Sequence, residues 1–325
     1  MKYFLCPLFL VFTSMLYAQA KNAYSLEANY FYGNILEHNP HIGHLITHHP
    51  EGLLLSLNKK TFGHEAWEAR YNYPDLGYSF SYQNLKNTYL GENYGLYAHL
   101  GFYFLNRNLN LKVGQGLAYA TNPYHPDKNY INNAYGSRIL SSTFFSGNFK
   151  KEDLIGGIGF QAGFALVHYS NADYKSPNNS TNTIAFNAGL NYLFNSEVER
   201  TYIPKVDEKY SEPFHYNLVM RSGFNTIGII GSKSYPFLTF SAYADKRINR
   251  KSTFQGGAEF FLSRALEEFI YYQSVTFPFG ETEGNEDAKR VGVFLGHQLT
   301  FHRLSLITHL GYYVYYPYDN YVERV

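Results

Sequence analysis

The chain has 325 residues, and its 27 Lys and Arg against 26 Asp and Glu give a net charge of +1. The chain therefore lacks the excess of positive charge that is typical of nucleic-acid-binding proteins, which excludes nucleic-acid binding. The single cysteine is Cys6, so residues 21–325 offer no disulfide, thiol nucleophile or cysteine metal site.

The first twenty residues have the pattern of a secretory signal peptide. Met1-Lys2 is a basic start, residues 3–17 form a short apolar stretch, and Ala18-Gln19-Ala20 is a small-x-small cleavage site. The apolar stretch is shorter than the roughly 20 residues of a membrane-spanning helix. We therefore expect residues 1–20 to be removed on export, which leaves residues 21–325 as the mature protein.

The mature sequence is aromatic without being strongly apolar. It contains most of the 33 Tyr and 27 Phe, while the mean hydropathy is −0.33 and charged residues make up 16%. Segments of about ten residues alternate between polar and apolar positions, and Asn, Gly, Pro, Asp and Lys separate them. We predict strands near residues 25–36, 51–60, 65–73, 76–84, 94–105, 108–121, 135–148, 154–170, 183–195, 215–224, 236–247, 253–262, 268–277, 290–300 and 303–316, and no helix.

This pattern is typical of an all-β protein that lies in a bacterial outer membrane. Closed barrels are the non-helical way to satisfy every backbone group in lipid, and they carry aromatic girdles at both interfaces. We expect one antiparallel transmembrane β-barrel over residues 21–325, with about 12 to 14 strands in its wall. The polar segment 196–213 is predicted to be a long loop. Because many such barrels end on an aromatic residue and this chain ends at Val325, we also expect a truncated C-terminus or a missing last strand.

The end of the strand predicted over residues 154–170 carries the most informative motif. Residues two apart on a strand point to the same face, so His168 and Ser170 project side by side. A serine hydroxyl needs a base to take its proton, and histidine is the natural base near neutral pH. The even-numbered residues of this strand carry the larger apolar groups, so this face is predicted to contact lipid, and the pair would act on a membrane lipid.

The residues His168-Tyr-Ser170-Asn171-Ala, followed by Lys-Ser-Pro177-Asn178, resemble the H-x-S-N…P-N signature of PagL-type lipid A 3-O-deacylases, the acyloxyacyl hydrolase-like outer-membrane barrels. The resemblance covers the part 21–195, and residues 214–325 add strands beyond the eight of smaller members. It implies that Ser170 is the nucleophile, His168 the general base and Asn171 a group that helps to hold the oxyanion. The implied reaction removes an ester-linked 3-hydroxyacyl chain from lipid A or a related glycolipid, with no metal or other cofactor.

The sequence departs from the family pattern at Asn182. Members of the family have an acidic residue fourteen positions after the histidine, and here that position is an asparagine. An asparagine can orient the imidazole by accepting from its N–H, but it supports the imidazolium less than a carboxylate does. Asp173 is the nearest acid along the chain, and its odd spacing from His168 puts it on the other face if the strand continues.

Two further functions remain open from the sequence. One is a catalytically silent outer-membrane barrel, porin-like or structural, that keeps the deacylase fold, and the other is a soluble, secreted, lectin-like β protein. The sequence also contains a cluster of histidines between residues 38 and 49, and the capture of zinc or copper is one possible function of this cluster. We expect that cluster to be a polar loop or barrel rim, because no acidic or cysteine partner has matching spacing.

Overall fold

The computed structural model describes residues 23–38, 40–206, 209–280 and 282–319. The expected signal peptide and the chain's last six residues lie outside these ranges. The chain divides into two compact units, which we describe separately. The first unit contains eight strands, and the second contains five strands and a helix together with the short segments 135–137 and 171–178.

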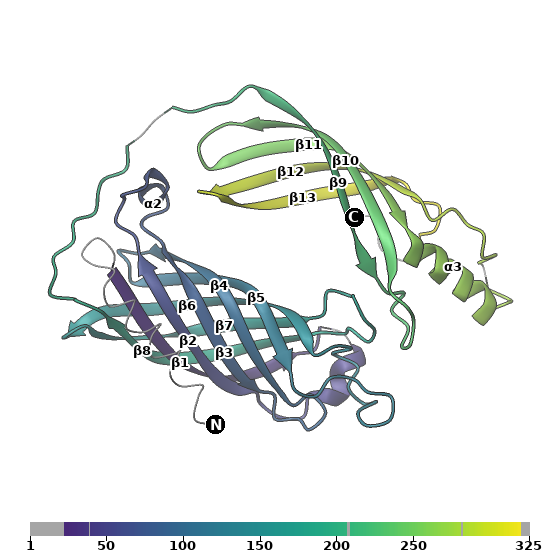
Figure 1. Ribbon diagram of the computed structural model, residues 1–325, viewed down its shortest axis with the longest axis horizontal. Coiled ribbons are helices and arrows are strands. Elements are labelled where there is room, and N and C mark those ends of the chain that lie inside the picture. Colours follow the sequence, from purple (N-terminus) through teal and green to yellow (C-terminus); the bar gives the residue numbers. More distant parts are fainter. Residues whose placement is uncertain (1–22, 39, 207–208, 281, 320–325) are drawn as a thin grey trace, which may run out of the picture. The chain divides into compact units, whose positions relative to one another are not determined.

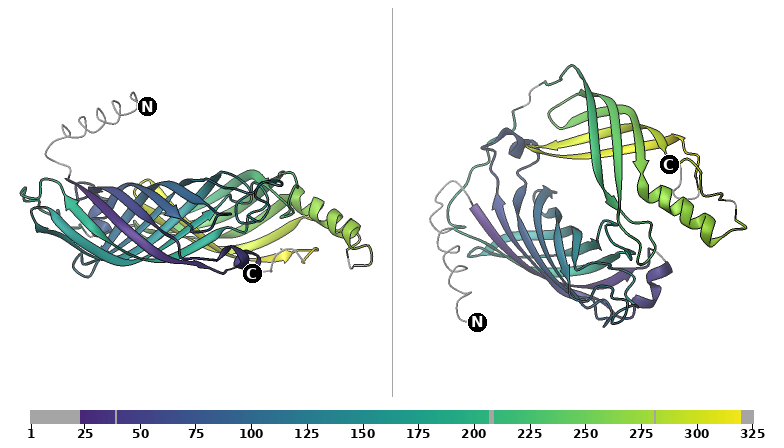
Figure 2. Two further views of the ribbon diagram at one scale, coloured as in Figure 1. Left: turned by 90° about the horizontal axis from the view of Figure 1, so that it is seen from below. Right: turned by 45° about the vertical axis from the view of Figure 1, so that its right-hand side comes forward.

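The first unit is a closed antiparallel barrel (Figures 1 and 2). Each strand pairs with the next along the chain, and β8 closes the barrel by pairing with β1. A short 3-10 helix, η1, and a short α-helix, α2, lie in its connections. The elements in chain order are β1 (Ala23–Leu36), η1 (Pro40–Leu45), β2 (Glu51–Lys60), α2 (Ala66–Arg70), β3 (Asp75–Asn84), β4 (Glu92–Phe104), β5 (Leu109–Ala120), β6 (Ile139–Ile155), β7 (Ile158–Ser170) and β8 (Thr181–Leu193).

The barrel wall has polar residues inside and apolar residues outside. In β1, Glu27 and Asn29 are each 2% exposed, whereas Tyr30 and Tyr32 are about half exposed. The same alternation continues around the barrel, for instance in β2 and β4. A water-soluble barrel would have the opposite polarity, so this wall is suited to a hydrocarbon surrounding.

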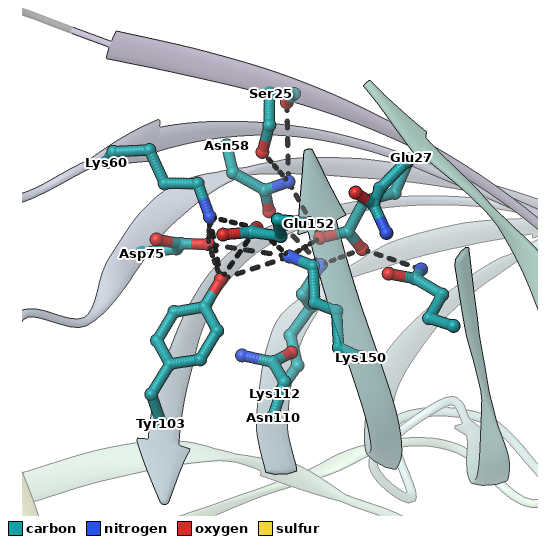
Figure 3. Close-up of polar contacts among 12 residues, drawn as sticks. Ser25, Glu27, Asn58, Lys60, Asp75, Tyr103, Asn110, Lys112, Lys150 and Glu152 are labelled. Atoms are coloured by element: carbon teal, nitrogen blue, oxygen red, sulfur yellow. Dashed lines mark hydrogen bonds and ion pairs between the residues drawn. The ribbon is translucent and has the colours of Figure 1, made fainter. Parts of the chain in front are cut away.

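An ion-paired network fills part of the barrel lumen (Figure 3). Glu27 accepts from Lys112 at 2.5 Å and from Lys150 at 2.8 Å. Lys60 donates to Asp75 at 3.0 Å and to the Tyr103 hydroxyl at 2.7 Å, which itself donates to Asp75 at 2.6 Å. Eight strands leave an interior just wide enough for side chains to fill, and here charged groups that neutralise one another occupy part of it.

The second unit is an open antiparallel sheet in the order β13-β12-β11-β10-β9 (Figure 1). Its elements are β9 (Phe214–Asn225), β10 (Tyr235–Arg247), β11 (Ser252–Ser263), α3 (Arg264–Thr276), β12 (Arg290–Phe301) and β13 (Leu304–Tyr315). The helix α3 begins where the Ser263 side chain accepts from the Leu266 N–H, an N-cap bond. Leu266 and Ile270 of α3 are buried against Ala288 and Tyr318.

The structure corrects three expectations. The strand expected near 65–73 is largely the helix α2, and the strand expected near 268–277 belongs to α3, so the prediction of no helix was wrong. The first segment contains helix-forming Ala and Glu, and α3 begins before the second one with the helix-forming run Ala265-Leu266-Glu267-Glu268. Arg264 also forms ion pairs with Glu267 and Glu268 one turn along α3. The described residues contain thirteen strands, but eight of them close a barrel by themselves, so a single wall of 12 to 14 strands is not confirmed.

The longest described helix is α3, with 13 residues. None of the helices within the described ranges is long and apolar enough to cross a membrane.

Candidate active site

The hairpin formed by β7 and β8 brings two of the predicted site residues together. The register of this strand pair places His168 directly opposite Asn182. The two side chains meet, with 2.7 Å between His168 Nδ1 and Asn182 Oδ1. The fourteen-residue spacing that marks the third family position is therefore the spacing of a cross-strand pair around this hairpin.

The contact with Asn182 determines the protonation pattern of the neutral imidazole. An amide oxygen can only accept a hydrogen bond, so His168 Nδ1 carries the proton and donates it to Asn182 Oδ1. The lone pair of the ring is then on Nε2, the nitrogen that a general base uses. Asn182 can orient the ring in this way, although it adds no negative charge behind it.

His168 and Ser170 lie on the outer face of the barrel wall. The even-numbered residues of β7 are the more exposed ones, such as Phe160 and Phe164, whereas odd-numbered residues such as Gln161 and Tyr169 are buried in the wall or lumen. His168 and Ser170 share the even parity and are half-buried at the end of the strand. The alternation agrees with the outward orientation predicted from the sequence.

A row of polar side chains continues from this pair across two neighbouring strands. On β6, Thr143 lies opposite His168 and Ser141 lies opposite Ser170. Gln115 on β5 joins both of them, because its Nε2 donates to Ser141 Oγ at 3.1 Å and its Oε1 accepts from Thr143 Oγ1. Sequence reasoning missed this row. The sequence signal that could have indicated this row is the presence of polar Ser141 and Thr143 on the outward face of a strand, where the next outward residue is the apolar Phe145.

An apolar groove begins next to the polar row on the same outer face. It has a volume of about 420 Å³ and is lined mainly by side chains of β5, β6 and β7. Gly147 contributes no side chain to this surface, and its position leaves room for a ligand between Leu111 and Phe164. A hydrocarbon chain fits such a lining, because the groove walls are aliphatic and aromatic.

The predicted oxyanion residue, Asn171, directly follows Ser170 and starts the loop 171–178. Its backbone N–H donates to Asn178 Oδ1 at 2.9 Å, and its side-chain Nδ2 donates to the Lys175 carbonyl at 2.5 Å. Asn171 and the Asn178 of the Pro-Asn motif thus hold one loop together. An amide has two N–H groups, so the second one of Asn171 is the one that the predicted role requires.

Asp173, the nearest acid along the chain, is engaged by Thr226. Its carboxylate accepts from Thr226 Oγ1 at 3.0 Å, and its carbonyl accepts from the Thr226 N–H at 3.0 Å. Burial raises the pKa of the Asp173 carboxyl, and the hydrogen bond from Thr226 opposes that rise. The acceptor that His168 Nδ1 contacts is Asn182 Oδ1 and not this acid.

The histidines between residues 38 and 49 lie in and around η1, in a connection between β1 and β2. His44 Nε2 contacts the Ile131 carbonyl at 3.0 Å, and His38 Nε2 contacts Ser180 Oγ at 3.1 Å. Within the described ranges, no group of three or more His, Cys, Asp or Glu side chains is arranged to hold a metal ion.

Comparisons with solved structures give likenesses of low identity. The crystal structure of the outer membrane enzyme PagL is 14% identical with a TM-score of 0.30, and the match covers 52% of this chain and 97% of that one. The crystal structure of Neisserial surface protein A is 12% identical with a TM-score of 0.31, covering 53% of this chain and 99% of that one. A comparison with curated protein sequences gives no match.

Two family models match the sequence in succession. Residues 51–191, from β2 into β8, match the model of lipid A 3-O-deacylase (PagL). Residues 214–324, which contain β9 to β13, match the model of the acyloxyacyl hydrolase C-terminal domain. The chain therefore belongs to the family of PagL-type lipid A 3-O-deacylases, the acyloxyacyl hydrolase-like outer-membrane barrels.

Proposed function

We propose that the protein is an outer-membrane serine esterase that removes an ester-linked acyl chain from lipid A or a related glycolipid. The observation that carries this proposal is the His168–Asn182 hydrogen bond on the outer face of the barrel, beside Ser170. A base whose ring is oriented by an acceptor, next to a hydroxyl, is the arrangement that nucleophilic ester cleavage requires. The family to which the chain belongs supports a lipid A substrate.

In the proposed reaction, Ser170 Oγ attacks the ester carbonyl while His168 Nε2 takes its proton. The oxyanion formed on the carbonyl oxygen is stabilised by N–H donors, among which we place the Asn171 amide. Collapse of the intermediate breaks the bond to the sugar oxygen, which takes the proton back from His168. Water, deprotonated by His168, then hydrolyses the acyl-serine to a free fatty acid and restores Ser170.

The surroundings of the pair fit a substrate that approaches from the bilayer. The polar row of Gln115, Ser141 and Thr143 provides hydrogen-bonding groups beside the reacting pair. The apolar groove next to it offers a surface along which the acyl chain of the ester can lie. Both features are on the outer face, where a membrane lipid reaches them without entering the lumen.

The second candidate is a silent barrel of the same fold, and Asn182 favours it because the residue lacks the charge of the family's acid. The filled lumen of the first unit does not support the porin-like form of this candidate, because Lys60, Lys112 and Lys150 occupy it with their carboxylate partners. A structural barrel without activity is the form that the experiment has to separate from the esterase.

The test is a comparison of lipid A from cells that express the full chain or its variants in a Gram-negative host without a deacylase of its own. We expect mass spectrometry to show a lipid A species that has lost one acyl chain with the native chain and not with Ser170→Ala or His168→Ala. Ser56→Ala is the matched control, because it removes a lumen hydroxyl that contacts Ser79 at 2.7 Å. An acyl pattern that is the same with Ser170→Ala as with the native chain, at equal membrane levels, rejects the proposed function and leaves the silent barrel.

A further inference from the structure

The sheet of the second unit has two faces of opposite character. Residues that stand opposite one another in the ladders β9–β10, β10–β11, β11–β12 and β12–β13 point to the same face, so the strand registers define both faces. One of them, which we call the apolar face, carries large hydrophobic side chains from all five strands. Its exposed members are Phe214, Tyr216, Leu218, Met220, Phe224, Leu238, Phe240, Phe254, Val293, Leu295, Leu304, Leu306, Leu310 and Tyr312.

On the opposite face, which we call the polar face, side chains form hydrogen bonds and an ion pair with one another. Arg221 Nη1 donates to Glu259 at 2.9 Å and to Ser241 at 2.8 Å. Gln255 donates to Gln298 at 3.1 Å, and its Oε1 lies 3.0 Å from His309 Nε2. These groups come from all five strands of the sheet.

The exposure of the two faces is inverted relative to a water-soluble sheet. Leu218 is 89% exposed and Leu310 is 73% exposed, whereas Ser241 is 2% exposed and Gln255 is 5% exposed. Burying apolar area is worth roughly 25 cal/mol per Å², so a chain with this face in water would lose much of its driving force for folding. The apolar face therefore needs an apolar surrounding.

Strand length and surface shape favour lipid acyl chains as that surrounding. The five strands have 12 or 13 residues, enough for transmembrane strands, which need about 9 to 11 residues when tilted. The apolar face also contains a groove of about 430 Å³ over Leu218, Met220 and Phe240, where Ala242 and Ala258 leave space. It has nearly the same size and composition as the groove on the lipid-facing wall of the first unit.

The edges of the sheet decide how it can lie in a bilayer. Among the described strands, β9 pairs with β10 alone and β13 pairs with β12 alone. Backbone groups of a bare edge cannot be satisfied in hydrocarbon, so a transmembrane sheet has to be closed. Two copies of this sheet provide ten strands, a number within the range of outer-membrane barrels.

We propose that the second unit is a membrane-spanning wall segment, with its apolar face against lipid acyl chains and its two edges closed by the same sheet of a second copy. Because the sheet has five strands, β9 and β13 run in the same direction, and each seam of the closed barrel is a parallel pair. Parallel pairing is slightly less stable per residue than antiparallel pairing, but it satisfies the same backbone groups. This inference concerns the second unit alone and does not depend on the proposed esterase.

Single cysteines test the lipid-facing part of the proposal, because the sequence has one native cysteine, Cys6, which is replaced by serine. The environment-sensitive dye NBD is attached to Leu218→Cys or Leu310→Cys on the apolar face. The matched controls carry it one residue away on the polar face, at Asn217→Cys or His309→Cys. The full chain is reconstituted in phosphatidylcholine vesicles, and quenching by doxyl-labelled lipid is compared with quenching by iodide.

We expect the doxyl lipid to quench the dye at positions 218 and 310 several-fold more than at 217 and 309, and iodide not to quench it at 218 and 310. Quenching at 218 and 310 by iodide, or by neither agent, overturns the lipid contact, because the face is then in water or covered by protein. Two strands are probed independently, so a variant that fails to insert does not decide the result.

A flexible bis-maleimide tests the seams. The double variant Asn217→Cys/His309→Cys carries one cysteine on each edge strand, and within one copy three strands separate β9 from β13. We expect a covalent dimer from the double variant and several-fold less of it from either single variant. A double variant that stays monomeric while the quenching pattern is as expected overturns closure by a second copy.

Discussion

Replacing Asn182 by aspartate restores the acidic residue of the family pattern at a position where the geometry is already in place. The amide oxygen of Asn182 lies 2.7 Å from His168 Nδ1, and an aspartate has the same length and keeps an oxygen at this point. The substitution therefore adds a negative charge behind the imidazole and leaves the ring orientation unchanged. In the proposed reaction His168 becomes an imidazolium when it takes the proton of Ser170, so this charge is expected to stabilise the transition state more than the ground state.

The size of the gain follows from the charge separation. Two unit charges about 4 Å apart attract by about 1 kcal/mol in water and by about 4 kcal/mol at the effective dielectric near a protein surface. Each 1.36 kcal/mol corresponds to a tenfold rate, so the expected acceleration of Asn182→Asp lies between about fivefold and about a thousandfold. Asn182 is half-buried at the outer face, which places the expectation inside this interval.

The assay is the rate of fatty-acid release from lipid A by the purified full chain in detergent micelles, followed by mass spectrometry. Asn182→Ala removes the acceptor and is expected to slow release at least tenfold. Asn34→Asp is the charge control, because it adds a carboxylate to the outer face of β1, where Asn34 pairs with Ile184 and not with His168. Equal rates for the native chain, Asn182→Asp and Asn182→Ala would refute the assignment of Asn182 as the residue that orients His168.

Three further predictions concern other parts of the molecule. Glu27→Gln removes the buried carboxylate that Lys112 and Lys150 share, while Lys150 keeps Glu152 at 2.7 Å. We expect it to lower the free energy of unfolding by about 3 to 5 kcal/mol in urea titration of the reconstituted chain, and an unchanged midpoint would contradict the role given to the lumen network. Gly147→Leu fills the outer groove and displaces about two methylene groups of a bound acyl chain. At about 0.8 kcal/mol for each methylene group, we expect roughly tenfold slower deacylation and an unchanged free energy of unfolding. An unaltered deacylation rate would show that the acyl chain lies elsewhere. Asp173→Asn keeps an acceptor for Thr226 and removes a carboxyl group whose pKa is raised by burial. Because the ionised carboxylate is the form that burial destabilises, we expect the variant to be more stable than the native chain by less than about 1 kcal/mol at pH 7. In urea titrations below the ordinary carboxyl pKa this difference should vanish.

Thirteen of the predicted strands correspond to strands of the structure, because side-chain alternation is a local property that survives in any barrel or sheet. The two segments that became helices, α2 and most of α3, fail for a related reason. Both segments carry aromatic residues that are typical of strands, while Ala and Glu within α2 and the run Ala265-Leu266-Glu267-Glu268 at the start of α3 favour a helix. Which tendency wins was decided by contacts beyond the segment, such as Glu68 of α2 accepting from the Gly63 N–H at 2.8 Å and Ile270 of α3 packing on Tyr318.

The sequence by itself determined the site motif and its orientation. His168 and Ser170 share one face of a strand because they are two residues apart, and the apolar residues before them identify that face as the outer one. The contact between His168 and Asn182 is also close to a sequence property, because a hairpin with a fixed register sets it. The sequence spacing of fourteen residues predicts that Asn182 lies near the imidazole, but it does not predict the 2.7 Å distance between His168 Nδ1 and Asn182 Oδ1.

Only the tertiary structure decided where the barrel closes and what surrounds the site. Pairing of β8 with β1 ends the barrel at eight strands, and no local pattern distinguishes these strands from β9 to β13. Thr143 lies opposite His168 through strand pairing over 25 positions of sequence, and Gln115 contacts Thr143 across the next strand pair over 28 positions. Such contacts depend on register between separate strands, and alternation alone leaves that register open.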